Sequence, residues 1–137
     1  MITSLSPFLS FTGQAADALA LYQRALGGDV VHQSFYKPGE EGIEGTIRHA
    51  ILKTAGTKLN LIDVPPDAAF RFDPSNSLLI ECDSAEEVKH IADVLGKEGE
   101  VMMPLDAYPF ADAFTWLADR FGVNWQVLYA GDAAYPS

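Results

Sequence analysis

The sequence contains a single cysteine, Cys82, so this chain of 137 residues cannot form an internal disulfide. Basic residues are also scarce, since nine Lys and Arg stand against nineteen Asp and Glu and the net charge is −10. Binding to nucleic acid or to an anionic membrane requires positive surface, so neither partner is expected. No apolar run approaches the ~18 residues that cross a bilayer, and residues 1–7 lack the regions of a signal peptide. These absences predict a cytoplasmic protein.

What is present is typical of a globular domain, because 48% of the residues are hydrophobic and only 20% are charged. Two segments, Ala15–Leu26 and Ala85–Leu95, have apolar residues at the i, i+3, i+4, i+7 spacing of an amphipathic helix. Gly27 follows the first segment, and Ser84 precedes the second as an N-cap. Eight shorter segments rich in aliphatic and aromatic residues are predicted strands: Phe8–Phe11, Val30–Tyr36, Thr46–Thr54, Lys58–Asp63, Ser77–Cys82, Val101–Leu105, Phe114–Asp119 and Asn124–Tyr129.

The order of these elements, β-α-β-β-β, occurs twice. Ala15, Ala18 and Tyr22 of the first predicted helix align with residues 85, 88 and 92 of the second, about 70 positions later. Three prolines mark the segment between the two halves. The sequence therefore predicts an α+β fold in a single domain 1–137, made of a βαβββ module at 1–64, a linker at 65–76 and a second βαβββ module at 77–137.

Several segments are similar to one known family. They are the opening run Pro7–Phe11, the run Met103–Phe110, and the motif D-x-F-G-V-x-W-Q at Asp119–Gln126. On these residues the chain resembles the vicinal oxygen chelate superfamily, with its glyoxalase and bleomycin-resistance fold. It is most similar to the PhnB-like branch, often called 3-demethylubiquinone-9 3-methyltransferase. The resemblance implies curved mixed sheets around a cavity, in a homodimer that binds a small organic molecule.

The resemblance also implies where a metal would be held. Metal-dependent members carry a His on the first strand and a Glu on the fourth strand of each module. The corresponding positions here are Pro7, Asn60, Ser77 and Gln126, which offer neither imidazole nor carboxylate. We therefore expect no metal and no other cofactor. Glycine-rich nucleotide motifs are missing from the sequence too, so it does not support methyltransferase activity.

His49 is the best candidate for a catalytic residue. Strand alternation predicts that Ile47, His49 and Ile51 share one face, and an imidazole there could act as a general base or ligand. The alternative is a half-buried histidine with one backbone partner. Tyr108 and Phe110 fall in a predicted loop, where aromatic side chains shape ligand specificity. The expected ligand-binding set is His49, Asn60, Ser77, Tyr108, Phe110, Trp116 and Gln126.

Other chemically interesting residues are given structural roles. Asp63 ends one predicted strand and Glu81 lies near the end of another, where exposed carboxylates are common. Asp119 is predicted to fix the following turn by accepting hydrogen bonds from backbone amides. Cys82 is predicted to be a buried packing residue rather than a nucleophile.

Three functions remain open on the sequence. The first is a metal-free dimer that binds a small organic molecule. The second is a metal-dependent lyase or dioxygenase of the glyoxalase superfamily, with a non-standard ligand set that includes His49. The third is a dimer whose catalytic site has decayed. Whether the protein is an enzyme is not decided by these residues.

Overall fold

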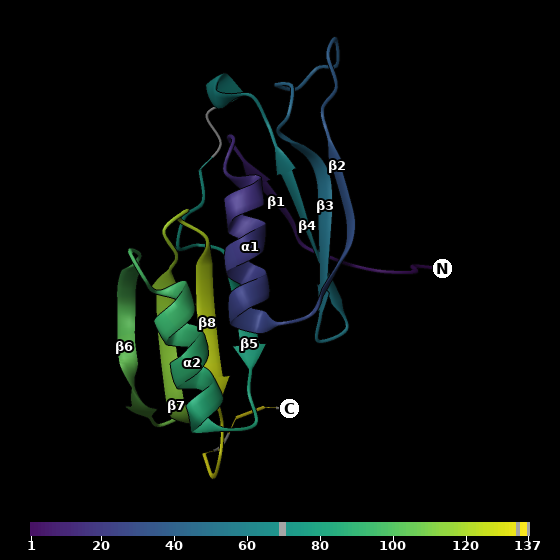
Figure 1. Ribbon diagram of the computed structural model, residues 1–137. Helices are drawn as coiled ribbons and strands as arrows, with labels where there is room; N and C mark the ends of the chain where they lie inside the picture. The colour runs from purple at the N-terminus through teal and green to yellow at the C-terminus, as the bar shows by residue number, and fades with distance from the viewer. Residues whose placement is uncertain (69–70, 134, 137) are drawn as a thin grey trace. The chain divides into compact units, whose positions relative to one another are not determined.

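The computed structural model describes residues 1–68, 71–133, 135 and 136 (Figure 1). The chain divides into two compact units, residues 1–70 and 71–137, and this division lies within the segment predicted as a linker. Each unit contains four strands and one α-helix in the order β-α-β-β-β. The predicted α+β fold with two βαβββ modules is therefore confirmed.

Unit 1 is a four-stranded mixed sheet with α1 packed on it. The strands lie in the order β1-β4-β3-β2, with β1 parallel to β4 and the other neighbours antiparallel. A short 3-10 helix, Pro66–Ala68, follows the last strand. The elements are β1 (Phe8–Phe11), α1 (Ala15–Leu26), β2 (Asp29–Phe35), β3 (Ile47–Thr54) and β4 (Thr57–Asp63).

Unit 2 repeats this topology with a second helix. Its strands lie in the order β5-β8-β7-β6, and β5 is parallel to β8. Figure 1 shows α2 lying across this sheet, where it contacts β7 and β8. The elements are β5 (Ser77–Glu81), α2 (Ala85–Leu95), β6 (Glu100–Tyr108), β7 (Ala111–Ala118) and β8 (Asn124–Tyr129).

Each helix buries one apolar stripe on its sheet, as the periodicity predicts. The stripe of α1 includes Ala15, Ala18 and Tyr22, none of them solvent-accessible, and that of α2 is built on Val88 and Leu95. The two helices begin in different ways. Ser84 caps α2, since its Oγ accepts a hydrogen bond of 3.2 Å from the N–H of Glu87. At the start of α1, Gln14 makes no side-chain cap, so the free amides there need another partner.

The hairpin between β6 and β7 differs from the prediction. Sequence patterning ends the strand at Leu105 and leaves Tyr108 and Phe110 in a loop. In the structure β6 continues to Tyr108, which pairs with Ala111 across a two-residue turn. β6 is an outer strand of its sheet and has three register irregularities, so it accommodates Pro104, which cannot donate a ladder hydrogen bond.

Within the part of the chain that the structure describes, neither helix is long and apolar enough to span a membrane.

Candidate functional site

Apart from Phe110, which lies in the turn between β6 and β7, the candidate residues lie on the sheet faces that are turned away from the helices, which we call the open faces. On β3, Ala50 and Leu52 are fully buried on the side of α1, whereas His49 and Ile51 alternate with them and are only partly buried. Asn60 on β4 pairs with Ile51 on β3, and directly paired residues lie on the same face of a sheet. Asn60 therefore shares the open face of unit 1 with Ile51 and His49. This alternation agrees with the predicted orientation of His49.

His49 and Asn60 form a direct polar contact. Nε2 of His49 lies 2.8 Å from Oδ1 of Asn60. The amide nitrogen of Asn60 donates to the carbonyl oxygens of Pro7 at 3.1 Å and Lys58 at 3.3 Å. Asn60 thus links β3, β4 and the residue before β1, and His49 has a side-chain partner instead of the backbone partner considered from the sequence.

Two further rings lie against His49, and neither belongs to the expected ligand-binding set. The Phe8 ring stacks on the imidazole with 5.2 Å between centroids and 15° between planes. His32 approaches it at 5.3 Å and 57°. Phe8 remains 55% exposed despite this contact. The only sequence signal for Phe8 is its position on a strand, because its contacts are with residues far along the chain.

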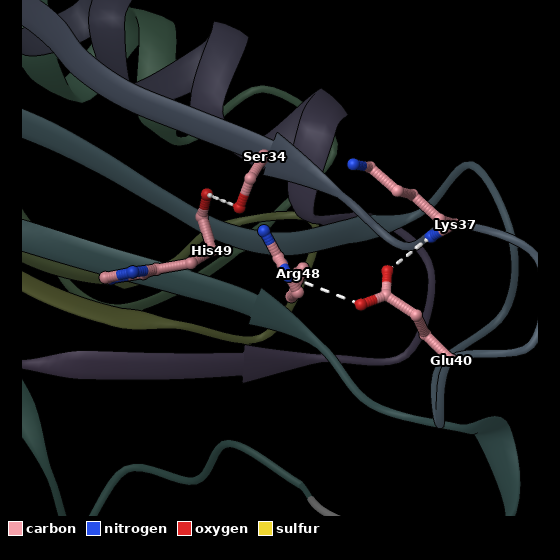
Figure 2. A network of polar contacts seen from close by, with 5 residues as sticks. All are labelled: Ser34, Lys37, Glu40, Arg48 and His49. Carbon is pink, nitrogen blue, oxygen red and sulfur yellow. Dashed lines mark hydrogen bonds and ion pairs between the residues drawn. The ribbon is translucent and has the colours of Figure 1, made fainter.

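Charged side chains near this strand pair with one another. Arg48, on the opposite side of β3 from its neighbour His49, forms an ion pair of 3.3 Å with Glu40. The same carboxylate accepts a hydrogen bond of 2.6 Å from the N–H of Lys37 (Figure 2). Figure 2 shows the imidazole of His49 extending away from Glu40 and Lys37. These contacts fasten the β2–β3 loop to β3 and leave His49 outside the charged cluster.

The open face of unit 2 carries the other predicted polar pair. Nε2 of Gln126 donates a 3.0 Å hydrogen bond to Oγ of Ser77, and both side chains are partly buried. Trp116 is paired with Gln126 across β7 and β8, and its indole N–H donates to Oδ1 of Asn124 at 3.1 Å. The predicted binding residues therefore fall into two groups, with His49 and Asn60 in unit 1 and the remainder in unit 2.

Tyr108 and Phe110 belong to an aromatic cluster on unit 2. Their rings stack at 5.7 Å, and both meet the ring of Phe114 edge-on, at 5.6 and 4.9 Å. The cluster packs on buried Ala111 and Leu128, and the Tyr108 hydroxyl donates to the Pro104 carbonyl at 2.7 Å. Much of the surface of these rings is therefore used in contacts with one another, within the hairpin.

The residues at the positions implied for a metal do not fit one. In unit 1, Asn60 and Pro7 are joined by a hydrogen bond, and in unit 2, Gln126 and Ser77 are joined likewise. Amide, hydroxyl and carbonyl oxygens give no anionic or imidazole donor for a transition metal. Across the described residues, no three His, Cys, Asp or Glu side chains gather closely enough to hold a metal ion.

The two aspartates considered from the sequence are both structural, and the prediction for one of them is wrong. Asp63 is only 2% exposed, not an exposed strand end, and its Oδ1 accepts from the amides of Gly13 at 2.8 Å and Ala15 at 3.0 Å. It supplies the missing cap of α1 from β4, and such a distant contact leaves no local signal. Glu81 is exposed, as predicted. Asp119 accepts from the amides of Phe121 and Val123, which confirms its predicted role in the turn.

The surroundings of Cys82 make it a poor nucleophile. The side chain is partly buried, and burial first, then the nearby carboxylates of Glu87 and Asp83, raise the pKa of the thiol from 9.0 to about 11. Thiolate is the reactive form, so the geometry supports a packing role.

Alkylation of Cys82 by iodoacetamide should therefore depend on pH with a midpoint near 11 in the folded protein and near 9.0 in urea. Well below both values, the thiolate fraction is expected to be about 100-fold lower in the folded protein. Because the raised pKa favours the protonated folded state, its contribution to stability is complete below pH 9 and is lost as the pH rises toward 11. The Cys82→Ser variant controls for other sites, and a folded midpoint at or below 9 would indicate an activated thiol.

Comparison with known proteins places the chain in a family. A family model described as 3-demethylubiquinone-9 3-methyltransferase matches residues 3–128. The chain therefore belongs to this family, the PhnB-like branch of the vicinal oxygen chelate superfamily.

Three relatives illustrate the match. Protein YjdN of Escherichia coli strain K12 is 28% identical, over 90% of this chain and 92% of its own. The solved PhnB protein of Bacillus cereus is 34% identical with a TM-score of 0.87, and the match covers 93% of this chain and all of that one. FosX, a fosfomycin resistance protein of Listeria monocytogenes solved with Mn(II) and sulfate, has a TM-score of 0.65 at 11% identity, covering 95% and 92% of the two chains. This last likeness shows the fold alone.

Proposed function

We propose that this protein is a metal-free member of the PhnB-like branch that binds a small organic molecule at the open faces of its sheets, and that it works as a homodimer. The observation that carries the proposal is the contact between His49 and Asn60 beside the exposed ring of Phe8. It combines a polar group of fixed orientation with an aromatic surface, the combination by which proteins orient small ligands. The pair Ser77 and Gln126 supplies a second polar position in unit 2.

The donor set supports the metal-free part of the proposal. The implied ligand positions hold no charged side chain, and their polar atoms already bond one another. Methyltransferase activity is not part of the proposal, because the sequence lacks the motifs that hold a nucleotide-like methyl donor. General base catalysis by His49 is compatible with the site but requires a substrate that places a proton near it.

A thermal-shift panel tests the proposal. The protein, freed of metal with EDTA, is melted with Ni²⁺, Mn²⁺, Zn²⁺ or Fe²⁺ and with a panel of uncharged aromatic and aliphatic molecules. A ligand at 100 times its Kd stabilises the folded state by about 2.7 kcal/mol. We expect no such shift with the ions and a clear shift with at least one organic class. Light scattering on the same sample should give about twice 14.9 kDa.

Each contrary outcome has a definite meaning. A metal shift that is lost in the His49→Ala variant would overturn the metal-free proposal and support a metal-dependent lyase or dioxygenase. His90→Ala, an exposed histidine on α2, is the matched control. No shift with any ion or molecule would overturn ligand binding and favour a decayed site.

A further inference from the structure

The contacts of Asn60 determine which nitrogen of His49 carries a proton. A side-chain amide has one oxygen, which accepts, and one nitrogen, which donates two hydrogen bonds. Both donors of Asn60 point at carbonyl oxygens, those of Pro7 and Lys58, and a carbonyl can only accept. Reversing the amide would set its oxygen against these two oxygens. The group that faces His49 is therefore the amide oxygen.

An acceptor at this position requires a donor on the imidazole. Nε2 of His49, 2.8 Å from Oδ1 of Asn60, must carry hydrogen in order to make this contact. A neutral imidazole has one N–H and one bare nitrogen, so the bare nitrogen is Nδ1. Among the described residues, no hydrogen bond to Nδ1 of His49 is found.

We infer that Asn60 is a positioning residue, which fixes the neutral form of the His49 imidazole as the Nε2–H tautomer and thereby offers Nδ1 as the acceptor for an O–H or N–H group of the ligand. The inference rests on the proposed function and names the class of ligand for that site. The exposed Phe8 ring, parallel to the imidazole, gives a flat apolar group a surface to stack on. The ligand is accordingly an uncharged, flat organic molecule with a hydrogen-bond donor at its edge.

The tautomer is tested first, without any ligand, by the side-chain ¹⁵N chemical shifts of the three histidines. The His32→Gln and His90→Gln variants assign the signals. At a pH where His49 is neutral, we expect a protonated Nε2 and a bare Nδ1. Asn60→Leu, which removes the acceptor, should move the signals toward a mixture of tautomers, whereas Lys58→Ala, which keeps Asn60 and the backbone carbonyl that it bonds, should leave them unchanged. A protonated Nδ1 in the unaltered protein overturns the inference, even if neither variant folds.

The ligand class is tested with phenol and toluene, which have nearly the same shape and differ in the donor. One hydrogen bond of ordinary strength predicts about 3- to 10-fold tighter binding of phenol. This preference should vanish in His49→Phe, which keeps a ring for stacking, and persist in His90→Gln. Equal binding of the two probes, a preference that survives in His49→Phe, or no binding of phenol overturns the ligand assignment. The proposed function is tested separately by the thermal-shift panel, because binding of any other organic molecule there would support it even if phenol does not bind.

Discussion

Replacing Asp63 by Ala is expected to lower the free energy of unfolding by about 3–5 kcal/mol. The carboxylate accepts hydrogen bonds from three backbone amides, those of Gly13 at 2.8 Å, Ala15 at 3.0 Å and Ile47 at 2.9 Å. Removing it leaves three donors without this partner, two of them in buried hydrogen bonds, and each buried donor without a partner is costly. Asp63→Asn should cost about 2 kcal/mol. The amide oxygen can still accept from Gly13 and Ala15, but the amide NH₂ group then faces the N–H of Ile47, and two donors cannot bond each other.

Urea unfolding followed by circular dichroism measures both variants. Glu81→Ala is the matched control, since Glu81 is also an acidic residue at the end of a strand but is exposed. Its effect should stay within about 0.5 kcal/mol. If Asp63→Ala were no more destabilising than this control, the carboxylate would not be the cap of α1.

The second large effect is expected at Asp119 in unit 2. One carboxylate oxygen accepts from the amides of Phe121 at 2.9 Å and Val123 at 3.1 Å, and the other accepts from the indole N–H of Trp125 at 2.9 Å. Asp119→Asn keeps the first oxygen but turns an amide nitrogen toward the indole N–H. Two donors then face each other in a buried site, so we expect a loss of about 2–3 kcal/mol.

A double-mutant cycle separates this effect from general disruption. In the Trp125→Phe background the opposing N–H is gone, so Asp119→Asn should cost about 1–2 kcal/mol less than it does in the unaltered protein. Urea unfolding of the four proteins gives the interaction energy. Strictly additive losses would show that the indole contact contributes nothing beyond packing.

The fold could be predicted because its signals are local. The ends of Ala15–Leu26 and Ala85–Leu95 follow from the apolar spacing and the adjacent glycines, and both helices are found as predicted. β6 was predicted to end at Leu105 because Asp106 and Pro109, which follow it, are typical of turns. Its position at the edge of the sheet makes these residues acceptable, and a strand's neighbours are not visible in its own sequence.

The site was predictable only in part, for the same reason. Alternation placed His49 on the open face, but the contact with Asn60 depends on the register of β3 against β4, which patterning does not determine. The exposed Phe8 and the neighbouring His32 join the imidazole across two other strand pairings. Asp63 was misjudged because its partners lie 48 and 50 positions away.

The contact between Asp63 and the start of α1 also bears on how the chain folds during translation. The first turn of α1 leaves the ribosome early, whereas its capping carboxylate is almost the last residue of the module to be made. A nascent chain that stops short of β4 lacks this cap, and its β1 has no parallel neighbour. We therefore expect unit 1 to remain incompletely folded during synthesis until its whole module has emerged.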